Sequence, residues 1–389
     1  MQPGIQNQVA TSSFFDGNGP VRSFFSPGRI NIIGEHLDYN GGYVFPGAIN
    51  LGITGTIQHR DDMHVRLSSE QEQGTCTVDL DSTTSLSFDA GREWANYPLG
   101  ALVYLKKSGM QFERGMNIRF SSTLPAGSGL SSSAALEILT AFMAAGELVA
   151  GTADLVHMAR LMQSMENEYI GVHCGIMDQF TVAMGKKGHA ILLNSETLEY
   201  TYVPVNTDEY TFVIINSNRP RRLADSRYNE RRNECERALA RIRAGGRSIR
   251  HLAQASAGDL NLIQDESLRK RARHVVTEQQ RVIDSVDALT RGDFPRFGRL
   301  LAESHASLRD DYEVTGRELD ALVLSSTEAR GCLGARMTGA GFGGCAIAYV
   351  SRDAVDEFSR AVGKRYSEMT GLSADFYESG LEDGVRELN

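Results

Sequence analysis

The stretch LPAGSGLSSSA, residues 124–134, determines the interpretation of the whole chain. A β-rich segment, residues 117–122, precedes it, and a helix-forming segment, residues 134–139, follows it. Two glycines permit tight turns and close backbone approach, and three consecutive serines stand where the helix begins. The first N–H groups of a helix lack internal partners, and the helix dipole is positive at that end. The stretch therefore predicts an anion site, most often for phosphate. The alternative is a serine-capped helix after a glycine turn.

The last serine of the run, Ser133, adds a possible metal ligand. Magnesium is a hard cation that prefers oxygen ligands, and a hydroxyl at the helix start can supply one. The stretch is not a Walker loop, because Gly-x-x-x-x-Gly-Lys-Ser/Thr occurs nowhere in the chain.

Composition indicates a soluble globular protein of about two domains, with 389 residues, 41% hydrophobic and 23% charged. The net charge of −9, without a long basic run, argues against nucleic acid as a partner. The five cysteines are scattered without a C-x-x-C pair, which argues against a zinc site or a disulfide framework. No apolar run is long enough to span a membrane, and the N-terminus lacks the features of a signal peptide. We therefore expect a cytoplasmic protein without membrane contact.

The segment GRINIIGEHLDYNGG, residues 28–42, carries the next dense signal. A short apolar strand breaks at Gly34 into a loop with Glu35, His36 and Asp38. Two carboxylates and an imidazole within four residues can read several hydroxyls of one sugar. The alternative is a polar turn between strands.

Strand-like pieces at residues 52–57, 64–67, 76–80 and 85–88 predict an antiparallel meander. The single tryptophan, Trp94, precedes a helix that extends to about residue 107. It is either a core residue or a flank for a nucleotide base.

Two carboxylates stand out after the glycine–serine stretch. Glu166 borders the apolar stripe of a helix predicted over residues 153–169, where an unpaired carboxylate is costly to bury. It is either a solvated flank or a ligand for a cation. Asp178 stands among apolar residues after a glycine and is either a base, a local electrostatic stabiliser or a helix N-cap.

The second half begins with a buried strand over residues 211–218. Helices are predicted near 228–243, 265–290 and 296–311. The segment MTGAGFGGC, residues 337–345, formally matches G-x-G-x-x-G. A strand-like run follows it rather than the helix of a dinucleotide fold, so the loop indicates close backbone approach or a phosphate contact.

Three blocks in a fixed order carry a family resemblance: GRINIIGEHLDYNGG, LPAGSGLSSSAALE and MTGAGFGGC. Together they resemble the GHMP small-molecule kinases, and the first is similar to the signature of the galactokinases in that family. The blocks GIMDQ, residues 175–179, and DSRYN, residues 225–229, are similar to galactokinase segments too. The resemblance extends from about residue 21 to 375.

This resemblance implies an α+β, two-domain GHMP kinase fold with the active site in the cleft between the domains. The N-terminal domain, residues 1–196, would hold the sugar signature and the phosphate loop, and residues 197–389 would form the C-terminal domain. The implied reaction is ATP-dependent phosphorylation of galactose at its anomeric hydroxyl, with Mg²⁺, in a monomeric cytoplasmic enzyme. The alternatives are a GHMP kinase for N-acetylgalactosamine, arabinose or a non-sugar alcohol, and a galactose-sensing regulator with the same fold.

The resemblance also implies residue roles. Asp178 matches the proposed catalytic base, Arg29 lies beside it, and Ser133 and Glu166 match the magnesium ligands. An arginine near Asp178 would keep that carboxylate ionised, which makes it a weaker base. The implied sugar contacts are Glu35, His36, Leu37, Asp38 and Tyr228. The implied nucleotide contacts are Gly127, Ser128, Gly129, Leu130, Ser131, Ser132, Ser133 and Trp94.

The chain departs from the family pattern at two positions beside these residues. Leu37 replaces a usual threonine, and His173 replaces a frequent asparagine. Both departures bear on which sugar fits rather than on the class of reaction.

Overall fold

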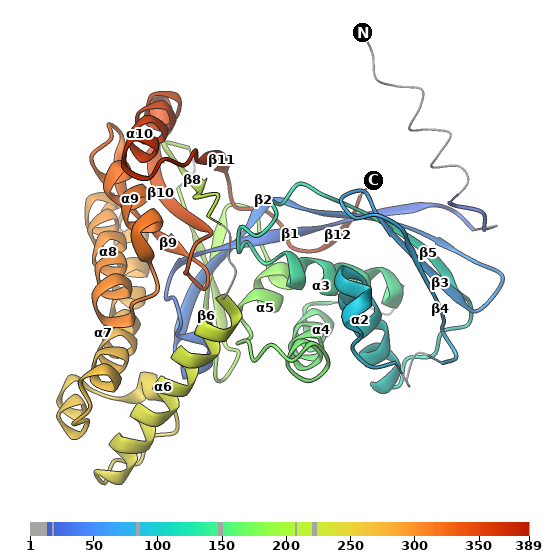
Figure 1. Cartoon of the computed structure of the whole chain (residues 1–389), viewed down its shortest axis with the longest axis horizontal. Coiled ribbons are helices and arrows are strands. Elements are labelled where there is room, and N and C mark those ends of the chain that lie inside the picture. The colour runs from blue at the N-terminus through green and yellow to red at the C-terminus, as the bar shows by residue number, and fades with distance from the viewer. Residues whose placement is uncertain are drawn as a thin grey trace.

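The computed structural model describes residues 14–17, 19–82, 86–146, 151–206, 208–219 and 224–388, which form two parts (Figure 1). Residues 1–13 of the expected first domain, and the side chains of Asp225 and Ser226 in the DSRYN block, lie outside the described residues.

The first part is built on a sheet of eight strands among the described residues. The strand order is β12-β1-β2-β5-β3-β4, with β6 paired to β2 and β7 paired to β6. The bounds are β1 Arg22–Ile33, β2 Tyr43–His59, β3 His64–Ser69, β4 Thr75–Asp79, β5 Met116–Ser122, β6 His189–Asn194, β7 Tyr200–Pro204 and β12 Arg386–Leu388.

Strands β1 and β2 form a long antiparallel pair at the centre of this sheet. The register shifts between Pro27 and Arg29, and again between Asn31 and Ile33. Proline has no N–H for the ladder, so an irregularity accommodates it. A bulge also re-aims the neighbouring side chains, and this one lies beside Arg29.

The expected antiparallel meander is wrong in two respects. Strand β5 lies between β2 and β3 and pairs with β3 in parallel, whereas only β3 and β4 form the expected antiparallel neighbours. Residues 86–88 form no strand. Alternation along each segment predicts strands but carries no information on which strand lies next to which.

Helices α2 to α5 cover one face of the first sheet, with α3 and α5 packed on β1 and β2 (Figure 1). The predicted helix over 153–169 ends at residue 165 and continues as one π-helical turn. The bounds are α2 Asn96–Lys107, α3 Ser132–Ala145, α4 Thr152–Met165 and α5 Met177–Met184, with the short segments η1 Asp38–Asn40, η3 Ala90–Ala95 and the π-turn η5 Glu166–Ile170.

The second part is built on an antiparallel sheet of four described strands, in the order β11-β8-β10-β9. Helices α8, α9 and α10 pack on it, and α7 packs against α6 and α8. The expected strand over 346–350 lies in β10, which is almost wholly buried, so its sequence is a continuous apolar run. The strands are β8 Tyr210–Asn216, β9 Cys332–Thr338, β10 Cys345–Ser351 and β11 Asp375–Ser379; the helices are α6 Ala224–Ala244, α7 Glu266–Thr290, α8 Phe294–Ser307, α9 Gly316–Thr327 and α10 Val355–Thr370; the short segments are η6 Leu252–Gln254, η7 Ala257–Leu262, the π-turn η8 Leu308–Tyr312 and η9 Arg352–Ala354.

The division expected between residues 196 and 197 does not follow the hydrogen bonding of the sheets. That division separates β6 from its partner β7. It also leaves β12 out of the first domain, although β12 pairs with β1. A boundary after β7, with the last strand returned to the first sheet, fits the pairing better. In the described ranges, no helix is both long and apolar enough to cross a membrane.

Candidate active site

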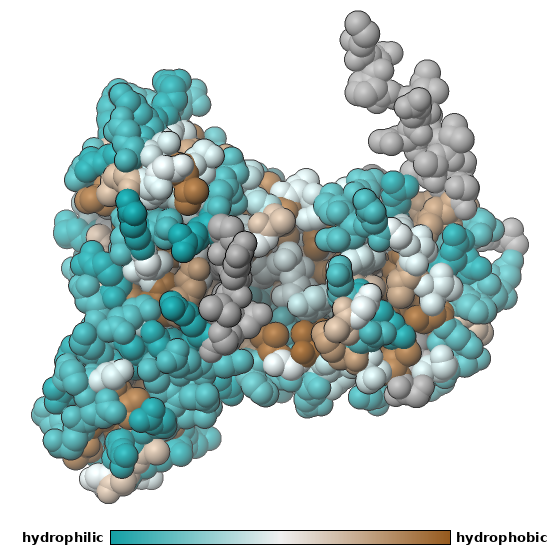
Figure 2. Space-filling view, in the orientation of Figure 1, coloured by the Kyte–Doolittle hydropathy of each residue, from teal (hydrophilic) through white to brown (hydrophobic). Residues whose placement is uncertain are grey.

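A cavity of about 430 Å³ lies between the two parts. Figure 2 shows that this mostly hydrophilic face of the molecule is hollowed there. Both parts contribute to the walls, because β1, α3 and α5 of the first part face α6 and the loop after β9 of the second. The lining side chains and backbone come from Arg29, Glu35, His36, Asp38, Tyr97, Gly127, Gly129, Ser131, Ser132, Ser133, Glu166, Val172, Cys174, Gly175, Met177, Asp178, Tyr228, Gly339 and Ala340.

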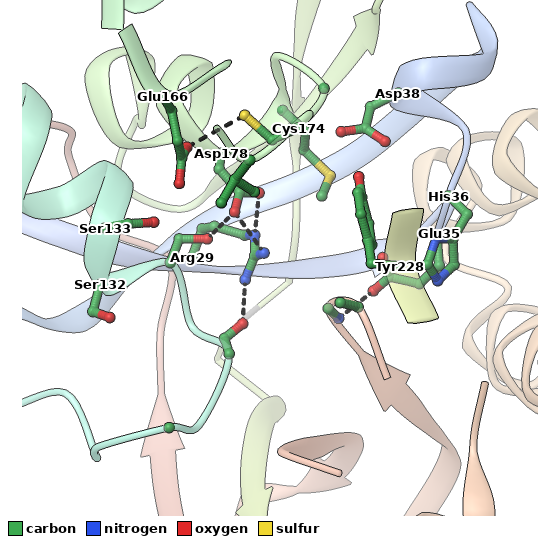
Figure 3. A pocket seen from close by; sticks show the side chains of 18 of the residues that line it. Arg29, Glu35, His36, Asp38, Ser132, Ser133, Glu166, Cys174, Asp178 and Tyr228 are labelled. Carbon is green, nitrogen blue, oxygen red and sulfur yellow. Dashed lines mark hydrogen bonds and ion pairs between the residues drawn. The ribbon is translucent and has the colours of Figure 1, made fainter. Parts of the chain in front are cut away.

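A two-pronged ion pair between Arg29 and Asp178 occupies the middle of this cavity (Figure 3). The Nε of Arg29 donates to Oδ1 of Asp178 at 2.8 Å, and its Nη2 donates to Oδ2 at 2.9 Å. The arginine side chain is 6% exposed and the aspartate 27%, so the carboxylate remains open to a ligand. Such paired hydrogen bonds fix orientation as well as charge. The expected neighbourhood of these two residues is therefore confirmed.

The glycine–serine loop closes over this ion pair from the start of α3. Ser131 has a left-handed backbone, with φ of 62°, and its hydroxyl donates to Oδ2 of Asp178. The third arm of Arg29, Nη1, donates to the carbonyl of Gly129 at 2.8 Å. Gly127, Gly129, Ser131, Ser132 and Ser133 line the cavity, so backbone N–H groups at the start of α3 face the space where an anion would lie.

Two residues of the loop do not reach the cavity. Ser128 and Leu130 are buried beneath it. Leu130 contributes through its backbone, because its carbonyl accepts the N–H of Arg29 at 3.1 Å. Its side chain is a core residue.

On the other side of the ion pair lie Glu35, His36, Asp38 and Tyr228 (Figure 3). Strand β1 ends at Ile33, and the chain turns into the following loop at Gly34, whose φ of 101° is a conformation that glycine adopts readily. His36 follows with a φ of 62°, an uncommon backbone for a residue with a Cβ. These two turns bring three polar side chains of the segment, Glu35, His36 and Asp38, to the cavity.

The carboxylate of Glu35 is already held by protein donors. Oε2 accepts Nδ2 of Asn31 at 3.0 Å, and Oε1 accepts the backbone N–H of Gly339 at 2.7 Å. Burial raises the pKa of Glu35, while the charges of Arg336 and Arg29 oppose that rise. The late glycine loop therefore contacts the carboxylate of Glu35. It also makes the close backbone approach that its sequence predicted, because the N–H of Phe342 donates to the carbonyl of Val314 at 2.7 Å.

Burial shifts the pKa values of His36 and Asp38 in opposite directions. Burial lowers the pKa of His36 well below its ordinary value, so its ring is neutral near pH 7. Its Nδ1 lies 2.8 Å from the hydroxyl of Tyr39. Burial, and then the negative charge of Asp178, raise the pKa of Asp38 to about 7. A Cβ on Gly175 would lie 2.0 Å from Oδ2 of Asp38, so only glycine fits behind this carboxylate.

Glu166 and Ser133 lie together on the side of the serine loop (Figure 3). Glu166 opens the π-turn η5, and such turns are frequent at functional sites. Its Oε2 accepts Nε2 of Gln179 at 2.5 Å and the Sγ–H of Cys174 at 3.3 Å. Burial, and then the charge of Asp178, raise the pKa of Glu166 to about 6. A second carboxyl, Glu137, is fully buried nearby, and the same Gln179 donates to it at 3.3 Å.

Two residues expected in the site do not line this cavity. Leu37 has a fully buried side chain and does not line the cavity. Trp94 packs edge-on against Phe120 at a ring distance of 5.9 Å, and Tyr97, three residues later, reaches the cavity instead. The role of Trp94 beside a nucleotide base stays a prediction.

Sequence reasoning missed Tyr97, Cys174 and the backbone of Gly339 as wall residues. The signals were present but weak. Cys174 and Gly175 directly precede the apolar segment that carries Asp178, and an aromatic residue near the start of a helix is commonplace. These three residues are far apart in the sequence, so no local sequence pattern could show that they line the same cavity.

Comparison with known families gives matches along most of the chain. Residues 12–59 match the galactokinase galactose-binding signature, residues 96–186 the N-terminal domain of GHMP kinases, and residues 285–368 the GHMP kinase C-terminal domain. Among curated relatives, a galactokinase of Enterococcus faecalis is 47% identical over 96% of each chain. A galactokinase of Ligilactobacillus salivarius is 47% identical over the full length of both.

Solved structures agree with these matches. The crystal structure of Lactococcus lactis galactokinase complexed with galactose has a TM-score of 0.92, 44% identity and 98% coverage of both chains. The mevalonate kinase of Methanococcus jannaschii has a TM-score of 0.69 at 20% identity, covering 95% of this chain and all of that one. The latter similarity concerns the fold alone.

Proposed function

The chain belongs to the galactokinase family of GHMP kinases, and we propose that it transfers the γ-phosphoryl group of ATP to the anomeric hydroxyl of galactose, releasing galactose 1-phosphate and ADP. One observation supports the assignment of the site above all others. The Arg29–Asp178 pair stands between a wall of carboxylate, imidazole and phenol side chains and the N-terminus of α3, an arrangement that suits a sugar on one side and phosphate on the other.

The sugar would lie against Glu35, His36, Asp38 and Tyr228. Carboxylates accept strong hydrogen bonds from hydroxyl groups. Each oxygen of Glu35 keeps a further lone pair after its bond to protein. The neutral ring of His36 and the hydroxyl of Tyr228 can each pair with a sugar hydroxyl without adding charge. Such a wall suits a neutral polyol.

The phosphates of ATP would lie at the start of α3, against the backbone of the glycine–serine loop. Phosphoryl transfer needs positioning and neutralisation of charge more than covalent assistance. The N–H groups at this end of α3 and the guanidinium of Arg29 supply a positive field within an acidic protein. Arg29 is then positioned to stabilise charge that develops between the donor and acceptor oxygens.

The residues present fit a magnesium ion. Glu166 and Asp178 bring two acidic groups to the wall of the cavity, and Arg29 is the cation that binds Asp178. Ser133 and Glu166 would hold the ion, with the remaining oxygens coming from ATP. Within the described residues, no cluster of three His, Cys, Asp or Glu side chains holds a metal by itself, so a nucleotide-dependent site agrees with the donor set. When bound, the ion would neutralise charge on the phosphates.

Asp178 would orient the anomeric hydroxyl and accept its proton as the phosphoryl group arrives. Three donors from Arg29 and Ser131 already hold the carboxylate in one orientation. A strong base is not required where the transition state is loose, because the hydroxyl becomes acidic only as its oxygen bonds to phosphorus. The proton therefore moves late along the reaction.

The other functions are less well supported. A kinase for N-acetylgalactosamine or arabinose, or a galactose sensor, would share the fold, but the relatives at 47% identity are galactokinases. The intact Arg29–Asp178 pair also speaks against a sensor without catalysis. We further propose a cytoplasmic location, in keeping with five free cysteines. We also propose a monomeric state.

The testing experiment is a screen of sugars with ATP and magnesium in which ADP release is followed. Galactose should give the highest kcat/KM, and the product should carry phosphate on the anomeric oxygen by ³¹P and ¹H NMR. ADP release that does not depend on galactose, or a clear preference for another sugar, would contradict the proposal.

A further inference from the structure

Two side chains of helix α7, Glu278 and His274, bind the backbone of the loop that carries Glu35 and His36. Neither of them lines the cavity. Oε1 of Glu278 accepts the N–H of Gly34 at 3.0 Å. One turn earlier on the helix, Nε2 of His274 lies 3.1 Å from the carbonyl oxygen of Glu35. Because residues i and i+4 share one face of a helix, this face of α7 contacts two peptide groups of the loop, Ile33–Gly34 and Glu35–His36, which lie on either side of the peptide between Gly34 and Glu35.

The loop needs such support because its backbone is strained. Gly34 and His36 both have positive φ, at 101° and 62°. A non-glycine residue in the left-handed region persists only where its surroundings hold it there. With both neighbouring peptide groups fixed, Glu35 and His36 have little freedom to turn away from the cavity.

Glu278 is a buried charge whose partners explain its presence. The side chain is fully buried, yet the charges of Arg281 and its neighbours lower its pKa to about 2, so it is ionised. Besides Gly34, the carboxylate accepts Ser304 Oγ and Arg281 Nε, each at 2.6 Å. A buried carboxylate is costly unless all its hydrogen bonds are made, and an ionised acceptor holds an N–H more strongly than a neutral one.

The protonation of His274 matches its position. Burial lowers its pKa to about 4, so the ring carries one proton near pH 7. The carbonyl of Glu35 can only accept, so that proton is on Nε2, and Nδ1 accepts from Ser307 Oγ at 2.9 Å. The ring also contacts Tyr312 at a centroid distance of 4.5 Å.

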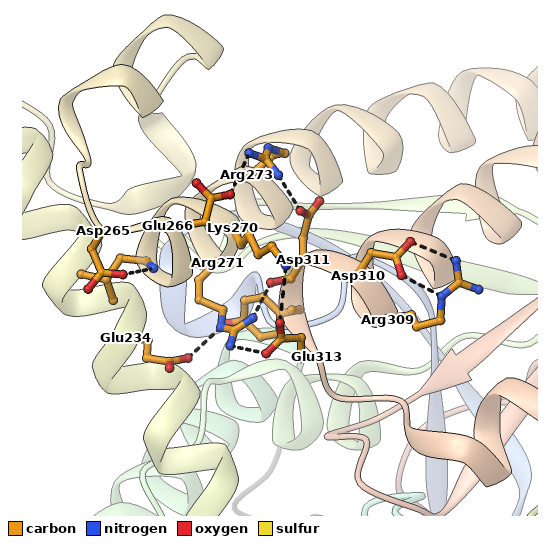
Figure 4. Close-up of polar contacts among 12 residues, drawn as sticks. Glu234, Asp265, Glu266, Lys270, Arg271, Arg273, Arg309, Asp310, Asp311 and Glu313 are labelled. Carbon is orange, nitrogen blue, oxygen red and sulfur yellow. Dashed lines mark hydrogen bonds and ion pairs between the residues drawn. The ribbon is translucent and has the colours of Figure 1, made fainter.

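Helix α7 is itself anchored at its N-terminal half (Figure 4). Arg271, which is 3% exposed, donates to Glu234 on α6 and to Glu313 after η8, both at 2.8 Å. A helix tied to two further elements is a rigid support for the loop that it holds.

We propose that Glu278 and His274 are positioning residues of the sugar site: they hold the peptide groups of Gly34 and Glu35 and so set the affinity for galactose without touching it. This inference rests on the proposed function. Preorganisation of a loop raises affinity because the cost of ordering it is met before binding.

The experiment measures galactose affinity by calorimetry without nucleotide, together with separate KM values for galactose and ATP. Glu278→Met removes the acceptor for Gly34 at similar volume, and His274→Phe removes the donor to Glu35 while keeping a ring against Tyr312. Each should raise the galactose Kd and KM roughly tenfold, as expected for loss of a hydrogen bond to a fixed backbone, and leave the KM for ATP within about twofold. Glu278→Gln retains an acceptor oxygen and should recover most of the affinity.

The matched control is Leu289→Ala, a core truncation near the C-terminal end of α7. It should lower the melting temperature without changing the galactose Kd. If Glu278→Met does not fold, His274→Phe decides the result. A folded Glu278→Met or His274→Phe variant with an unchanged galactose Kd, in a wild type that phosphorylates galactose, would overturn this inference. A wild type inactive on galactose would instead overturn the proposed function.

Discussion

The guanidinium of Arg336, on β9, lies 3.5 Å from Oε1 of Glu35 at the end of β1, and both side chains are buried. The Nη1 atom of Arg336, which is the one nearest to Glu35, also donates to the carbonyl oxygens of Asn31 and Ile32, at 3.0 and 3.1 Å. This arginine of the second sheet therefore holds the end of a strand in the first sheet, directly behind a proposed sugar contact.

Replacing Arg336 by methionine should lower the free energy of unfolding by about 3 kcal/mol, because it leaves the charge of Glu35 buried without its cation. The measurement is denaturant unfolding followed by circular dichroism. Arg330→Met is the matched control, since Arg330 pairs with Glu357 at the surface, with exposures of 72% and 54%. That change should cost less than about 1 kcal/mol. Similar losses in both variants would show that the buried pair has no special weight.

Asp178→Asn should give a folded protein that binds galactose and turns over very slowly. Removal of one proton-accepting or orienting group typically lowers the rate by about 10²–10⁴. The readouts are kcat at saturating substrates and the galactose Kd by calorimetry. Near-normal turnover would exclude the proposed role of Asp178.

Glu166→Gln should raise the magnesium concentration that gives half-maximal activity, because it removes a charged oxygen ligand next to Ser133. The measurement is a titration of activity with magnesium at a constant total concentration of ATP. Glu168→Gln, two residues later and exposed, is the control and should leave the titration unchanged. An unaltered magnesium dependence in Glu166→Gln would make Glu166 a structural residue only.

Galactose should be a far better substrate than its 4-epimer glucose. A site built to pair a given hydroxyl leaves its own polar groups unpaired when an epimer turns that hydroxyl away, and the rejection can reach about 10⁴. Galacturonate should fail too, because its carboxylate would approach Glu35 within a buried site. The test compares kcat/KM for galactose, glucose, galacturonate and N-acetylgalactosamine. Equal values for glucose and galactose would show that the wall of Glu35, His36 and Asp38 does not read the sugar.

The galactose affinity should depend on pH through Asp38, whose pKa is raised to about 7. Below that pH the carboxyl is mostly protonated, and above it the group is ionised and accepts sugar hydroxyls more strongly. The galactose Kd should therefore fall between pH 6 and pH 8. In Asp38→Asn this change should disappear. A wild-type Kd that is flat across this range would argue against Asp38 as an ionised acceptor.

The sequence predicted the chemistry of the site better than its extent. Arg29 and Asp178 are 149 residues apart, and nothing local to either indicates their contact, which was expected from the family resemblance and is confirmed. The start of α3 was predictable from residue types alone, since glycines and serines before an apolar run indicate a turn followed by the first residues of a helix. Leu37 was misplaced because loop position does not reveal which way a side chain turns, and its apolar side chain joins the core.

The fold was predictable where it is local. Most strands and helices stand near their expected places, whereas the parallel pairing of β3 with β5 and the return of β12 depend on contacts between distant segments. The π-turns η5 and η8 were read as plain helix, because one additional residue in a turn leaves the apolar spacing almost unchanged.

The pairing of β12 with β1 also constrains the order of events during synthesis. Ser23 lies opposite Leu388, and Phe25 lies opposite Arg386. Strand β1 therefore cannot complete its pairing on this edge until residues 386–388 have been translated. Until then this edge of β1 offers unpaired N–H and C=O groups to any passing strand. The second sheet needs nothing translated after residue 379 and can close first. Completion of the first sheet therefore requires residues 386–388, which are translated after the four strands of the second sheet.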